Sequence, residues 1–174
     1  MSAAAPPVVA APFLAATVIL AGAGLAKIRR PDYTARALQA ARWRVGRRAV
    51  RAGAAVEVAV AVAAVAWPVA LTGALVAVAY GAFAVFVTVA LRRGWALSSC
   101  GCFGRPDSRP NYLHAVLNAA AALVALWWAA APPGHLTRML SSSPWGGAPL
   151  ALVSAVIAGL AYLVWTNPLS QEVA

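Results

Sequence analysis

The chain has 174 residues, of which 63% are hydrophobic and only 10% are charged. A domain that folds in water is roughly half apolar and a quarter charged, and a disordered chain has fewer apolar residues still, so the composition excludes both classes. The net charge of +10 would suggest nucleic acid in a soluble protein. Here the positive charges stand in short gaps between apolar runs, which is typical of a multi-pass protein of the cell membrane. We therefore expect the lipid membrane as its partner, and no nucleic acid.

Five apolar runs are each close to the roughly 20 residues that a helix needs to cross a bilayer. Residues 52–91 carry a single charge, at Glu57. As one helix they would be about 60 Å long, twice the hydrocarbon thickness. Trp67-Pro68 predicts a tight turn over residues 67–72, because proline ends a helix and tryptophan prefers the interface. We predict an all-α polytopic bundle that forms one membrane domain over residues 1–174, with spans at about 7–26, 52–70, 72–91, 112–131 and 148–166.

Two connectors between these runs are basic. Residues 27–51 hold nine Lys/Arg and one acid, residues 92–111 hold four Lys/Arg, and the remaining basic residue is Arg138. Because positive connectors stay on the inner side, we predict the N-terminus outside, and the C-terminus and the cysteine loop at 92–111 in the cytoplasm. Residues 33–50 are predicted to form an amphipathic helix on the membrane surface, with arginines toward lipid phosphates and Trp43 at headgroup depth.

The two cysteines form the element Cys100-Gly101-Cys102 in the second connector. Two thiols one residue apart can close into a small disulfide ring, for which Gly101 supplies unusual backbone angles. A disulfide away from relaxed geometry is easier to reduce, which suits thiol exchange, and the arginines on both sides favour the reactive thiolate. Two alternatives stay open: the thiolates suit Cu(I) as ligands, or the cysteines are inert and buried. A structural zinc site is not expected, because it needs four ligands.

Glu57 and Lys27 are the next candidates. Glu57 is the only acid within an apolar span, where a charge is costly and usually has a partner or a function. Alternatively it lies shallow, where it is hydrated or pairs with Arg51. Lys27 is the only lysine among fourteen basic residues. It either reaches the interface with its flexible stem, pairs with Glu57, or acts as the cation that lowers the pKa of a cysteine.

Asn118 lies about two turns into the fourth span, where a buried amide is expected to bond across helices. His114 stands one turn earlier on the same face, either as a proton shuttle or as an ordinary interfacial residue. In the predicted topology all the candidates lie in the inner leaflet or just beyond it. We therefore predict one polar pocket beneath the cysteine loop, formed by Lys27, Glu57, Cys100, Cys102, His114 and Asn118.

Several of these elements resemble the MauE branch of the DoxX-like membrane proteins, over roughly residues 12–131. The matching features are Gly24-Leu25-Ala26-Lys27, Glu57, Asn118, and Arg93-Gly94 followed by Cys100-Gly101-Cys102-Phe103-Gly104. The resemblance implies a four-helix membrane bundle, here with a fifth, C-terminal helix outside the family core. It also implies a redox role in disulfide formation or thiol transfer during maturation of exported proteins, often beside a thioredoxin-like partner. The chain departs from the family at Leu117, where an arginine is usual.

We therefore expect a membrane thiol-disulfide redox protein, either an oxidoreductase or a redox-maturation subunit. Cys100 and Cys102 would cycle between dithiol and disulfide, Lys27 and Glu57 would tune thiolate formation and proton transfer, and Asn118 with His114 would support the pocket. The substrates of such a pathway lie outside while the charge rule puts the cysteines inside, so a partner or a lipid quinone is the candidate electron acceptor. The alternatives are a Cu(I)-handling protein and a non-catalytic accessory subunit.

Overall fold

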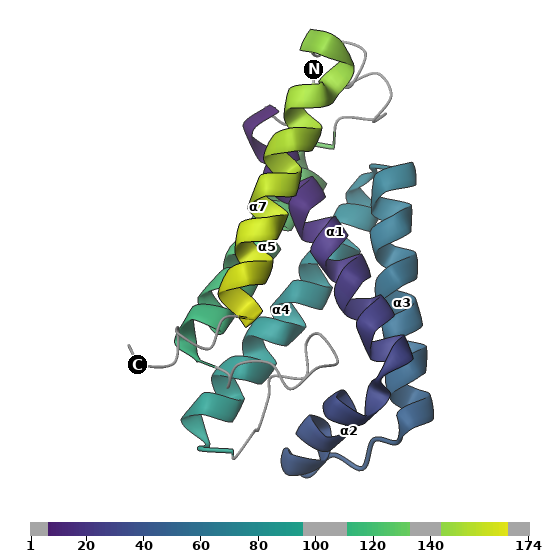
Figure 1. Cartoon of the computed structure of the whole chain (residues 1–174), viewed down its shortest axis with the longest axis vertical. Helices are drawn as coiled ribbons and strands as arrows, with labels where there is room; N and C mark the ends of the chain where they lie inside the picture. Colours follow the sequence, from purple (N-terminus) through teal and green to yellow (C-terminus); the bar gives the residue numbers. More distant parts are fainter. Residues whose placement is uncertain (1–6, 96–110, 133–143, 167–174) are drawn as a thin grey trace.

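The computed structural model describes residues 7–95, 111–132 and 144–166, and their regular structure is entirely helical (Figure 1). This confirms the predicted all-α bundle. Four helices are long and apolar enough to cross a membrane, and the predicted fifth span folds as a helix whose apolar stretch, Ala148–Leu163, is shorter. The elements in chain order are α1 (Pro7–Arg29), α2 (Pro31–Ala40), α3 (Arg47–Ala66), α4 (Ala70–Arg92), α5 (Tyr112–Ala130), η1 (Pro144–Gly147) and α7 (Ala148–Thr166).

The turn between α3 and α4 lies where Trp67-Pro68 predicts it, although it is shorter than residues 67–72. Helix α3 ends at Ala66 and α4 begins at Ala70. The Thr72 hydroxyl donates a hydrogen bond to the Trp67 carbonyl oxygen at 2.7 Å and accepts one from the Val69 amide at 3.2 Å. These bonds satisfy backbone groups that the helix ends leave without partners, so the chain reverses within three residues.

The first basic connector differs from the prediction of one surface helix over residues 33–50. It contains the shorter helix α2, and α3 begins at Arg47, several residues before the predicted start at 52. The break occurs at Arg42, whose φ of 63° is left-handed, and the chain then runs extended through Gly46 with φ −88° and ψ 167°. Arg47, Arg48 and Arg51 therefore belong to the first turns of a helix long and apolar enough to span a membrane, and not to a separate surface helix.

Helix α1 is the centre of the bundle. It lies between α3 on one side and α7 on the other, packs also against α5, and crosses in front of α4 (Figure 1). In its most apolar window 56% of the residues are buried, against 22–28% in α3, α4 and α5, so the other three expose apolar faces suited to lipid. Phe13 of α1 stacks on Trp128 of α5 with ring centroids 4.3 Å apart, and the Tyr80 hydroxyl of α4 donates to the Ala16 carbonyl oxygen at 2.7 Å.

Helices α1 and α3 pack closely at Gly24. A Cβ atom added there would lie 2.7 Å from Val58 Cγ2 and 2.9 Å from the Ala54 carbonyl oxygen, so a side chain has no room. Small residues of this kind allow membrane helices to pack backbone against backbone. Lys27 follows three residues later and therefore lies on nearly the same helix face. The close contact at Gly24 thus directs Lys27 toward α3.

Candidate functional site

Lys27 of α1 and Glu57 of α3 form an ion pair inside the bundle. Lys27 Nζ lies 2.7 Å from Oε1 and 2.6 Å from Oε2 of Glu57, and the side chains are 5% and 17% exposed. The structure thus shows the pairing that the sequence left as one of three roles for Lys27. Glu57 does not pair with Arg51, the alternative considered, because Arg51 Nε donates to the Ile28 carbonyl oxygen at 3.3 Å.

The surroundings of Lys27 compensate for the burial of its charge. On the side of α4, the ammonium lies 4.6 Å from the centroid of the Phe83 ring, whose electron-rich face attracts a cation. A buried ion loses the solvation of water, and it is tolerated only where a counter-ion and further polar contacts replace that solvation. Glu57 and Phe83 together do so, and the pair as a whole carries no net charge.

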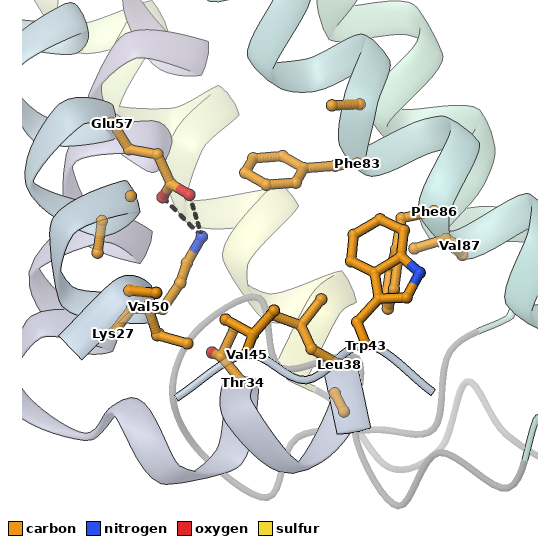
Figure 2. Close-up of a pocket in the computed structure, with 15 residues that line it drawn as sticks. Lys27, Thr34, Leu38, Trp43, Val45, Val50, Glu57, Phe83, Phe86 and Val87 are labelled. Atoms are coloured by element: carbon orange, nitrogen blue, oxygen red, sulfur yellow. Dashed lines mark hydrogen bonds and ion pairs between the residues drawn. The ribbon is translucent and has the colours of Figure 1, made fainter. Parts of the chain in front are cut away.

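The ion pair borders a cavity of about 290 Å³ between α2, α3 and α4. Figure 2 shows Lys27 and Glu57 on one wall and Phe83, Phe86 and Val87 of α4 on the opposite wall. Helix α2 and the link that follows it close one end of the cavity. The lining is formed by Lys27, Thr34, Ala37, Leu38, Trp43, Val45, Ala49, Val50, Gly53, Ala54, Glu57, Ala82, Phe83, Phe86 and Val87.

Helices α3 and α4 diverge from their common turn, and the cavity lies between them at the end of the bundle where α2 packs (Figure 1). The residues that face the gap include Ala49, Gly53 and Ala82, which are too small to fill it. At Gly53 an added Cβ would meet nothing within 4 Å. Helix α2 closes this end of the cavity, where Ala37 packs against Ala90 of α4 together with Phe86 and Trp95.

The cavity beside Lys27 and Glu57 does not include His114 or Asn118, which the sequence predicts to share a pocket with them. Both are buried on α5, but neither lines the cavity. The order of the helices around the bundle explains this, because α5 packs mainly against α4, whereas α1 packs mainly against α3. Depth in the membrane, which the sequence indicates, does not determine which helices are neighbours.

His114 and Asn118 instead organise the start of α5. Asn118 Nδ2 donates to the His114 carbonyl oxygen at 2.7 Å, so this bond stays within α5 and does not cross between helices as predicted. The His114 amide donates to Asn111 Oδ1 at 3.1 Å, and His114 Nδ1 lies 2.6 Å from the same oxygen. Asn111 is thus the N-cap of α5, and His114 completes the cap.

Cys100 and Cys102 lie outside the described residues. The chain on the α4 side is described as far as Trp95, whose ring centroid lies 6.1 Å from that of Phe86, a residue of the cavity wall. On the other side it is described again from Asn111. The described chain on the α4 side therefore ends beside the cavity.

Sequence reasoning missed the aromatic part of the cavity. Phe83 and Phe86 are two of many apolar residues in α4, and no local pattern distinguishes them. Trp43 was assigned to headgroup depth, but it lines the cavity and makes an edge contact with Phe86, with centroids 6.1 Å apart. Its position depends on the turn at Arg42, which the predicted continuous surface helix did not contain.

The fold and the site define a multi-pass helical membrane protein with a buried ion pair at one end of its bundle. Residues 5–131 match the family model of the methylamine utilisation protein MauE, and the chain belongs to the MauE family. This confirms the resemblance inferred from the sequence. The match covers α1 to α5, and η1 and α7 follow it. Neither a curated protein nor a solved structure matches the chain.

We predict that Lys27 and Glu57 are energetically coupled. Lys27→Met and Glu57→Leu should each destabilise the fold by about 3 kcal/mol, because either change leaves an uncompensated buried charge. The double variant should recover most of that loss. The measurement is a double-mutant cycle on unfolding of the purified protein in detergent, with Arg51→Met as the exposed control. Losses that simply add in the double variant would show that the two side chains do not interact.

Proposed function

We propose that the protein is a membrane thiol-disulfide redox protein, in which Cys100 and Cys102 exchange electrons with a thioredoxin-like or other redox partner. One observation carries the proposal: a buried Lys27–Glu57 pair borders a cavity at the end of the bundle where α4 ends and α5 begins. The cysteine segment joins those two helix ends. Membership of the MauE family supports the same chemistry.

The length of the chain is compatible with this role. Cys100 follows Trp95 by five residues, which in extended form span at most about 17 Å. Trp95 packs against Phe86 of the cavity wall. A thiol at position 100 therefore has enough chain to reach the end of the bundle that holds the cavity, where the Lys27 ammonium, although paired with Glu57, can donate a hydrogen bond to a thiolate.

The proposed reaction is disulfide formation in the partner. A partner thiolate attacks one sulfur of the Cys100–Cys102 disulfide, which breaks that S–S bond and forms a mixed disulfide. The second thiolate of the partner then attacks the partner's sulfur in the mixed disulfide. This closes the partner disulfide and releases the cysteine of this chain as a thiolate. Two electrons have passed to Cys100 and Cys102, which take up two protons. The flanking arginines and Lys27 stabilise each thiolate as it leaves.

The four other candidate residues have two kinds of role. Lys27 and Glu57 are proposed to hold and transfer a proton at the mouth of the cavity, since the pair can share it between Nζ and a carboxylate oxygen. His114 and Asn118 are proposed as positioning residues. They stabilise the first turn of α5, to which the cysteine segment is attached.

We also propose that the N-terminus is outside, and that the cysteine segment and the C-terminus are cytoplasmic. Thirteen of the fourteen Lys/Arg belong to the two connectors at residues 27–51 and 92–111. An impermeant maleimide is a direct test, because the chain has only two cysteines. After reduction it should label inverted membrane vesicles and leave right-side-out vesicles unlabelled. The reverse pattern would overturn this orientation.

The exchange reaction is tested with Cys100→Ser and Cys102→Ser. One single variant should accumulate a mixed disulfide with its partner, because the remaining cysteine attacks the partner disulfide in the reverse of the proposed reaction and the second thiol that would release the partner is missing. Alkylation of growing cells, followed by a non-reducing gel and mass spectrometry of the adduct, detects it. The double variant is the control and should give no adduct. Copper bound stoichiometrically by the wild type and lost in both single variants, with no adduct in either, would overturn the proposal in favour of Cu(I) handling.

A further inference from the structure

The cavity between α2, α3 and α4 has the properties of a small-molecule site. Its volume of about 290 Å³ is close to the lower limit of pockets that bind such ligands, roughly 300 Å³. Apart from Lys27, Glu57 and Thr34, every residue that lines it is apolar. Binding sites of this type combine an apolar wall with a few polar groups that orient the ligand.

The walls favour a flat ring. Phe83 and Phe86 face the cavity from α4, and Trp43 faces it from the link after α2 (Figure 2). Trp43 and Phe86 meet edge to face, with an interplanar angle of 62°. Aromatic side chains contact the faces and edges of a ring ligand with more energy than the buried area alone supplies. An acyl chain has no ring and gains no such ring–ring contacts from the three aromatic side chains.

The polar group favours a neutral ligand that bears oxygen. An ammonium has three N–H donors, and the two Glu57 oxygens at 2.7 and 2.6 Å engage two of them at Lys27. One donor remains for a ligand oxygen on the side of Phe83. Because Glu57 cancels the charge of Lys27, the cavity does not attract a phosphate headgroup. Ala49, Gly53 and Ala82 on its rim are exposed, so the opening lies between α3 and α4.

From these observations we propose that the cavity binds the ring of an isoprenoid quinone. A ring oxygen accepts a hydrogen bond from Lys27 Nζ, and the ring lies against Phe83, Phe86 and Trp43. The isoprenoid tail leaves between α3 and α4 into the lipid. A membrane quinone meets each requirement of the site, since it is neutral, flat, rich in oxygen and soluble in the bilayer.

The role of this quinone as an oxidant rests on the proposed thiol function. The dithiol of Cys100 and Cys102 is oxidised to the disulfide, and the quinone is reduced to the quinol. Two S–H bonds break, one S–S bond forms, and the two electrons and two protons complete two O–H bonds on the ring. One of these protons passes by way of Lys27 Nζ. The regenerated disulfide then serves the next partner.

Binding is tested with the full-length protein in nanodiscs and with ubiquinone-2, a benzoquinone that carries two isoprene units. Gly53→Leu fills the cavity without changing Lys27 or Glu57, because Gly53 lines it and has open space around it. Gly22→Leu is the matched control, since Gly22 is exposed on α1 and also has open space. Ala82→Leu fills the same cavity from α4, should Gly53→Leu fail a thermal unfolding check.

We expect saturable binding of one quinone per chain, weakened at least tenfold by Gly53→Leu or Ala82→Leu and changed less than twofold by Gly22→Leu. Geraniol, which has the same tail length and no ring, should not compete. Equal binding by the cavity-filling variants would overturn the site. Displacement of ubiquinone-2 by geraniol as effectively as by unlabelled ubiquinone-2 would overturn it as well, because it would identify a site for lipid tails.

A second measurement separates this inference from the proposed function. The double variant Cys100→Ser/Cys102→Ser should bind ubiquinone-2 like the wild type, whereas only the reduced wild type should convert it to quinol, followed by ultraviolet absorbance. Binding without quinol formation would contradict the role as oxidant and leave the site in place. A mixed disulfide with a partner in a protein that binds no quinone would overturn the quinone site and leave the thiol function standing.

Discussion

The structure depends on a charge pair held where charges are costly. Lys27 and Glu57 join α1 to α3 near the end of the bundle where α2 packs, beside an otherwise apolar cavity. Neither residue is tolerable there alone. The close packing at Gly24 brings the two helices near enough for the pair to form, and Phe83 supplies the remaining contact from α4. A purely structural pair would be weak evidence of function, since well-packed apolar residues stabilise a bundle at least as well. The cavity beside this pair is what suggests chemistry.

The ion pair and the cavity lie at one end of the molecule. Helix α2 and the link through Trp43 close the cavity at this end, while α3 and α4 leave it open between them. Helix α5 contributes no side chain to the lining, but its capped start anchors the segment that carries the cysteines. Helix α7 follows the part of the chain that matches the MauE family and packs on the opposite side of α1 from α3, away from the cavity. Its position suits a role in assembly more than one in catalysis.

The sequence predicts the helices well because hydrocarbon thickness and proline leave few alternatives. The runs between charges and the Trp67-Pro68 turn determine the helix ends to within a few residues, except at the basic connector. There the left-handed Arg42 divides the predicted surface helix, and no glycine or asparagine signals it. The pairing of Lys27 with Glu57 could be foreseen, since each is unusual for its position. The position of His114 and Asn118 outside this cavity could not be foreseen, because the depth of a residue in the bilayer does not determine which helices are neighbours. Phe83 and Phe86 give no local signal at all.

The central claim is that the buried pair prepares the thiols for exchange. The most direct test compares the alkylation rates of Cys100 and Cys102 in the reduced wild type and in Lys27→Met/Glu57→Leu, at pH 7 with a membrane-permeant maleimide. We expect at least a tenfold slower reaction in the double variant, because the Lys27 ammonium proposed to donate a hydrogen bond to the thiolate has been removed while the fold is retained. Equal rates in two equally folded proteins would contradict it, and would reduce Lys27 and Glu57 to a clamp between α1 and α3.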